Sequence, residues 1–248
     1  MIACLIVLGV GIISLILFLI RKCKGYSLEG TAIKAFTSVC FIAIGVISWY
    51  CSNKVENNYF GLFVILGLVF GMLGDISLEL KYVFREDDTI LTKLGFLTFG
   101  IGHVLYLTGI ILCFWKPFEE MLTYVSYKKY LHLLLPFVGA LLFIFIVIIL
   151  EKPMNVKYGK MKPIVLAYSF ILCLMMIMSI SMAIMYKFNN LTLNLLAIGG
   201  ILFTVSDLIL SGTYFGQGKD RPIDLISNTA IYYFAQFAIA FSILMMAM

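Results

Sequence analysis

Charged residues are scarce in this sequence, and their scarcity argues against a water-soluble protein. Only 12% of the 248 residues are Asp, Glu, Lys or Arg, while 62% are hydrophobic. Soluble domains contain about 25% charged residues. Because a soluble core cannot absorb this much apolar surface, the composition indicates a protein embedded in a membrane.

The motifs of several common enzyme classes are also missing. The chain has no glycine-rich phosphate loop, no HExxH and no GxSxG, which argues against nucleotide, zinc and serine-hydrolase chemistry. Its six cysteines show no CxxC spacing and predict neither disulfides nor a metal site. Basic residues are spread over the connections, so we expect membrane lipids as partners, no nucleic acid and no cofactor.

Long apolar runs, by contrast, fill nearly the whole chain. A helix of about 20 apolar residues crosses the roughly 30 Å of hydrocarbon in a bilayer. Eight such runs predict an all-α polytopic bundle of eight transmembrane helices in one integral membrane domain, residues 1–248. The predicted spans are 2–20, 32–51, 59–80, 94–115, 131–150, 163–186, 192–214 and 226–247.

Lys and Arg concentrate in the first, third, fifth and seventh connections, beginning with Arg21, Lys22 and Lys24. The positive-inside rule therefore predicts that these connections are cytoplasmic and that both termini lie on the other side. No basic residue precedes the first span, so we interpret it as a helix of the mature protein rather than a secretory signal.

Two aspartates lie deep in the predicted spans, where an ionised carboxylate costs about 3 kcal/mol. Asp75 and Asp207 share their surroundings: a glycine eight residues earlier, a small residue directly before, and a leucine three residues later. Small residues allow a neighbouring helix or a ligand to come close. A carboxylate that only pairs with a neighbour to hold the bundle together is the simpler alternative.

The two aspartates lie in the third and seventh spans, which cross the membrane in the same direction. Each is roughly 8 to 10 Å from the C-terminal end of its helix, so both carboxylates are expected at one depth. The spacing also suggests two parallel four-helix halves.

Other polar residues are predicted at the same level of the bundle, and we expect them to line a polar cavity with the aspartates: Lys34, His103, Asn228, Tyr232 and Gln236. Tyr106 lies on the face of His103. Glu79 is one helical turn beyond Asp75 and on the same face, but its neighbour Lys81 favours a role as an interfacial anchor.

These segments resemble the lysoplasmalogenases, also called the YhhN-like family. The resemblance rests on GLVFGMLGDISL around Asp75, FLTFGIGHVLY around His103, GGILFTVSDLIL around Asp207 and YYFAQ ending at Gln236. Lys34 begins a Lys-Ala-Phe-Thr stretch where the family has Lys-Pro-Leu-Thr. The resemblance implies a lysophospholipid substrate whose vinyl ether bond is hydrolysed to a fatty aldehyde and a glycerophospho-base.

Vinyl ether hydrolysis requires an acid that protonates carbon and a carboxylate that stabilises the resulting cation or activates water. We predict that Asp75 and Asp207 form this catalytic pair and that His103 orients water or a carboxylate. Lys34, Asn228, Tyr232 and Gln236 would bind substrate, with Lys34 or connecting-loop cations meeting the phosphate. No metal is expected.

Three other functions remain open from the sequence. A proton- or ion-coupled transporter also uses buried carboxylates, although it needs access from both faces. An intramembrane aspartyl protease would have Gly-x-Gly-Asp, where this chain has Met-Leu-Gly-Asp ending at Asp75, and Tyr where it has Ser206. A lipid-binding protein without activity is the third. The sequence does not determine the oligomeric state.

Overall fold

The computed structural model describes residues 1–52, 59–122, 126–153, 155–216 and 221–246, without the side chains of residues 115–133. In this part of the chain eight α-helices account for most residues: α1 (Ile2–Cys23), α2 (Leu28–Cys51), α3 (Tyr59–Leu80), α4 (Asp88–Leu122), α5 (Ser126–Leu150), α6 (Lys162–Met185), α7 (Leu191–Phe215) and α8 (Pro222–Met245). Short 3₁₀ turns, Arg85–Asp87 and Gly159–Met161, precede α4 and α6.

The helices extend beyond several predicted spans because their ends use polar residues that an apolar run does not include. Ser27 caps α2 by accepting a hydrogen bond from the backbone N–H of Gly30 at 3.1 Å. Asn190 caps α7 in the same way through Leu193, also at 3.1 Å. These caps satisfy backbone donors that the first helical turn leaves unpaired.

Within the described residues, seven helices are long and apolar enough to cross a membrane. The remaining predicted span, 131–150, corresponds to α5, whose described apolar stretch, Leu134–Leu150, is shorter. The chain is therefore an integral multi-pass membrane protein, and the prediction of an all-α bundle is confirmed. The predicted end of the last span, residue 247, lies outside the described residues.

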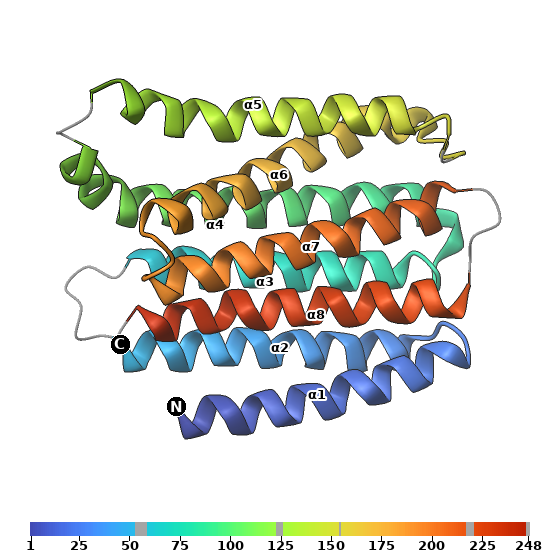
Figure 1. Ribbon diagram of the computed structural model, residues 1–248. Coiled ribbons are helices and arrows are strands. Elements are labelled where there is room, and N and C mark those ends of the chain that lie inside the picture. Colours follow the sequence, from blue (N-terminus) through green and yellow to red (C-terminus); the bar gives the residue numbers. More distant parts are fainter. Residues whose placement is uncertain (53–58, 123–125, 154, 217–220, 247–248) are drawn as a thin grey trace.

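All eight helices run along the long direction of one bundle, with α1 and α5 at its opposite edges (Figure 1). Consecutive helices pack together within 1–4 and within 5–8, and the two groups meet mainly where α2 packs on α8 and α6 on α4, with smaller contacts of α8 on α1 and α3. If each helix is replaced by the helix four places later, with α1 following α8, the α2–α8 contact becomes the α6–α4 contact. This packing agrees with the predicted division into two related halves.

Glycines bring the helix pairs of each half close together. A Cβ at Gly67 of α3 would lie 3.0 Å from the carbonyl oxygen of Gly102 on α4 and would collide with Tyr106. A Cβ at Gly199 of α7 would lie 3.1 Å from the carbonyl oxygen of Ala235 on α8. The two glycines that precede the aspartates by eight residues therefore have the same role in both halves.

Candidate active site

One polar cavity contains both aspartates. It has a volume of about 490 Å³, and its walls include Asp75 of α3, Asp207 of α7 and Tyr232 of α8. Tyr26, Arg85 and Arg221 line its outer part and come from the connections α1–α2, α3–α4 and α7–α8. The C-terminal ends of α1, α3 and α7 lie together at one end of the bundle (Figure 1), so the cavity leads from the aspartates toward that end.

Asp75 is held by three side chains from two neighbouring helices. Its Oδ2 accepts hydrogen bonds from the Ser38 hydroxyl at 2.7 Å and the Tyr232 hydroxyl at 2.8 Å. Lys34 places its Nζ 3.4 Å from the other oxygen, Oδ1. The carboxylate is only 2% exposed, and the nearby ammonium offsets the cost of burying its charge.

Four charges form a buried network around Asp75. Glu79 Oε2 lies 3.2 Å from Lys22 Nζ and 3.4 Å from Lys34 Nζ, so two lysines and two carboxylates alternate. The prediction that Glu79 is an interfacial anchor is therefore wrong: Glu79 is 2% exposed. The reason is that Lys22, at the end of α1, reaches the face of α3 that Glu79 shares with Asp75.

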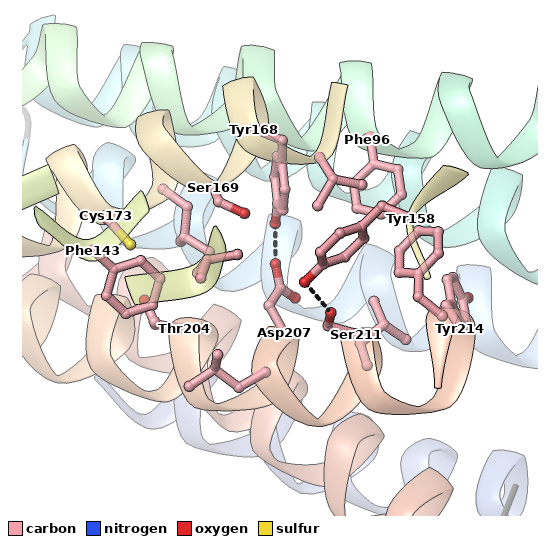
Figure 2. A pocket seen from close by; sticks show the side chains of 16 residues that line it. Phe96, Phe143, Tyr158, Tyr168, Ser169, Cys173, Thr204, Asp207, Ser211 and Tyr214 are labelled. Atoms are coloured by element: carbon pink, nitrogen blue, oxygen red, sulfur yellow. Dashed lines mark hydrogen bonds between the residues drawn. The ribbon is translucent and has the colours of Figure 1, made fainter. Parts of the chain in front are cut away.

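Asp207 has a different environment. Its Oδ2 accepts a hydrogen bond from the hydroxyl of Tyr168 on α6 (Figure 2). In the described part of the chain no lysine or arginine forms an ion pair with it, and the residue is half-buried rather than enclosed. The two carboxyl groups thus differ: Asp75 faces an ammonium, whereas Asp207 faces a neutral phenol.

The polar residues of α8 hold this arrangement together. Asn228 lines the cavity and donates a hydrogen bond to the carbonyl oxygen of Ser206 at 2.6 Å. Gln236 donates to the Tyr232 hydroxyl at 3.0 Å and accepts from the Tyr106 hydroxyl at 3.1 Å. Gln236 is 1% exposed and supports Tyr232 from behind.

His103 does not line the cavity. It is 1% exposed, and neither ring nitrogen has a hydrogen-bond partner among the described residues. Its ring packs edge to face against Phe203, with centroids 4.5 Å apart, and lies 5.9 Å from the ring of Tyr168. The structure therefore brings Lys34, Asn228 and Tyr232 to the aspartates, and leaves His103 in an aromatic layer behind them.

Sequence reasoning missed Ser38, Lys22 and Tyr168. Ser38 follows Lys34 by one helical turn, so helical periodicity could have placed both on one face. The sequence indicates only that Lys22 is a basic residue at a membrane boundary. The packing of α1 shows that its side chain points inward. Tyr168 is one of fourteen tyrosines, and no sequence signal distinguishes it.

No group of three or more His, Cys, Asp and Glu side chains that could hold a metal ion occurs in the described segments. The model of the YhhN family matches residues 30–243. The chain belongs to the YhhN family. This is the lysoplasmalogenase-type family, as the motifs around the aspartates indicated. Neither a curated protein nor a solved structure matches the chain.

The YhhN match extends from the first turn of α2 to the end of α8. It includes Lys34, Asp75, Tyr168, Asp207 and Tyr232, and thus both aspartates with their principal partners. Lys22 lies before it. The pair of aspartates at one cavity is therefore built from the part of the chain that the YhhN family defines.

Proposed function

We propose that this protein hydrolyses the vinyl ether bond of lysoplasmalogens, which are glycerophospholipids with a single alkenyl chain. One observation carries the proposal: Asp75 and Asp207, from equivalent helices of the two halves, line the same polar cavity. Two carboxyl groups in different environments supply the acid and the base that this hydrolysis requires.

The reaction adds one water across the bond. An acid donates a proton to the second carbon of the alkenyl chain, which leaves an oxocarbenium ion at the first carbon. Water attacks that carbon and gives its proton to a carboxylate. The hemiacetal then collapses: its hydroxyl proton passes to the glycerol oxygen, the carbon–oxygen bond breaks, and a fatty aldehyde and a free glycerol hydroxyl leave. Exchange of protons through the cavity restores both groups.

The environments of the aspartates support a different role for each. Asp75 lies beside Lys34 and accepts two hydrogen bonds, so it acts as the ionised carboxylate that stabilises the cation and receives the proton from water. Asp207 has a neutral partner and acts as the acid. Tyr168 donates to Oδ2 and leaves Oδ1 to carry the proton that the substrate receives.

The cavity also suits the glycerophosphate part of the substrate. Arg85 and Arg221 line its outer part, where Arg221 forms an ion pair with Asp224, and their guanidinium groups can bind a phosphate. Lys34, Tyr232 and Gln236 are occupied with Asp75 or with one another, so we assign them to positioning the carboxylate rather than to direct substrate binding. Asn228 fixes α7 against α8 beside Asp207.

The test is the release of free aldehyde by the purified protein. A 1-alkenyl lysophosphoethanolamine should yield stoichiometric aldehyde and glycerophosphoethanolamine. Its saturated 1-alkyl analogue, which presents the same headgroup and chain, should yield neither because it cannot form the cation. Aldehyde from neither lipid, with uptake of either lipid into vesicles, would instead favour a transporter.

A further inference from the structure

A second, smaller pocket lies on the other side of Asp207. It has a volume of about 50 Å³, and its walls come from α4, α5, α6, α7 and the connection that contains Tyr158. Figure 2 shows Asp207 at this pocket, with Tyr168 above it and the rings of Phe143 and Phe96 to either side. Apart from Asp207, its walls are apolar or carry only neutral polar groups.

Asp207 separates this pocket from the polar cavity. Asp207, Leu210 and Tyr214 line both spaces. A molecule that reaches the carboxyl group from both sides would have its charged part in the cavity with the two arginines and an apolar part in the small pocket. A single-chain phospholipid has this division between headgroup and chain.

The small pocket faces lipid rather than water. Phe143 and Val147 belong to α5, which lies at the edge of the bundle (Figure 1), and Leu208 is 45% exposed on the outer surface of α7. Toward the end of the bundle the pocket is closed by a hydrogen bond between the hydroxyls of Tyr158 and Ser211, 3.1 Å apart. Backbone pairing of Val156 with Gly216 fixes that connection to the end of α7.

In the first half of the bundle, charged side chains occupy the place that corresponds to the small pocket. Lys34 of α2, the second helix of its half, approaches Asp75, and Lys22 of α1 completes the ion pairs. In the second half Tyr168 of α6 approaches Asp207, and α5 contributes Phe143 and Val147. The same helix positions thus hold cations beside one aspartate and an apolar pocket beside the other.

We propose that the small pocket binds the first carbons of the alkenyl chain, so that the second carbon lies against the acid Asp207 and the rest of the chain remains in the bilayer. This inference rests on the proposed function. Because lipid tails are as apolar as the pocket, the pocket adds little affinity. Its effect is to orient the reacting carbon, which raises the rate of protonation.

A photoreactive lipid tests the location directly. The probe is a 1-alkyl lysophosphoethanolamine with a diazirine on the third chain carbon, which is not hydrolysed. After irradiation of the protein in phosphatidylcholine vesicles, peptide mapping should find the label on α5 and α7, at Phe143, Val147 or Leu208. Label on the apolar groove between α1 and α2, at Val10, Ile13 or Leu17, or without preference, would overturn the inference.

A matched pair of variants tests whether the small pocket raises the rate by orienting the reacting carbon. Val147→Trp fills the pocket, whereas Ile146→Trp places the same ring on a neighbouring, 49% exposed position of α5 that lines no part of it. Val147→Trp should lower aldehyde release about tenfold through misplacement of the chain, and Ile146→Trp should retain the wild-type rate.

Equal rates in both variants would contradict the pocket assignment, even if the wild-type protein hydrolyses the lipid. If the wild-type protein releases no aldehyde, the proposed function fails and the labelling alone decides whether the pocket binds a chain. If Val147→Trp does not fold, the labelling of the wild-type protein decides in the same way.

Discussion

At the scale of single residues, Lys34 has the greatest influence on the candidate site. It is buried and lies 3.4 Å from both Asp75 and Glu79, while Lys22 reaches Glu79 alone. Removing one partner of a buried ion pair leaves an uncompensated charge in a medium of low dielectric constant. The charge of Asp75 therefore depends on Lys34 more than on any hydrogen bond.

Lys34→Met should lower the stability of the protein by about 3 to 5 kcal/mol, because two carboxylates then share one lysine. The melting temperature in detergent measures the loss, and Lys93→Met, at an exposed lysine of α4, is the control. Adding Glu79→Gln to Lys34→Met removes the surplus negative charge and should recover part of the stability. A double variant no more stable than Lys34→Met would show that the network is not the cause.

The sequence predicted which carboxylates are unusual, but not how each is held. Asp75 and Asp207 are conspicuous because charge is rare in apolar helices. Their partners are not, since Ser38 and Tyr168 are common residue types in such helices. The structure distinguishes the two aspartates by helices that are distant in sequence, α2 and α8 for one and α6 for the other.

At the scale of helices, the close pairs α3–α4 and α7–α8 set the positions of the aspartates. Gly67 and Gly199 permit these approaches, and each lies two turns before an aspartate on the same helix. The sequence predicted the existence of all eight helices, because apolar runs of about 20 residues are typical of membrane-spanning helices. It misjudged several ends, since polar caps such as Ser27 and Asn190 lie outside the apolar runs.

Gly199→Ala should destabilise the protein by about 1 to 3 kcal/mol, because the added Cβ would lie 2.6 Å from Ile239 and 3.1 Å from a backbone carbonyl oxygen. Thermal unfolding in detergent measures this change. Gly9→Ala on α1 is the matched control, since nothing lies within 4 Å of its Cβ. An equal melting temperature for the two variants would contradict close packing at Gly199.

At the scale of the whole molecule, the polar cavity leads to one end of the bundle and so should meet water on one side of the membrane. The distribution of Lys and Arg predicts that this side is the cytoplasm. Two native cysteines can test the orientation, because Cys23 and Cys51 are both exposed and lie at the ends of α1 and α2, on opposite sides of the bundle.

In sealed right-side-out vesicles, a membrane-impermeant maleimide should label a variant that retains only Cys51. A variant that retains only Cys23 should be labelled only after the vesicles are permeabilised. The yield of labelled protein in each case is the measurement. Labelling of Cys23 alone in sealed vesicles would place the cavity on the outer side and reverse the predicted orientation.

The measurement that tests the central claim most directly is aldehyde release from a lysoplasmalogen by Asp75→Asn and Asp207→Asn. Both substitutions keep the size of the side chain and remove its acid–base chemistry. We predict that both variants insert and fold, Asp75→Asn with lowered stability because Lys22 and Lys34 then share the one carboxylate of Glu79, and that each loses aldehyde release by at least about 100-fold. Glu29→Gln, at a carboxylate that is 71% exposed and pairs with Arg21, should remain fully active. Wild-type rates in both aspartate variants would contradict the account.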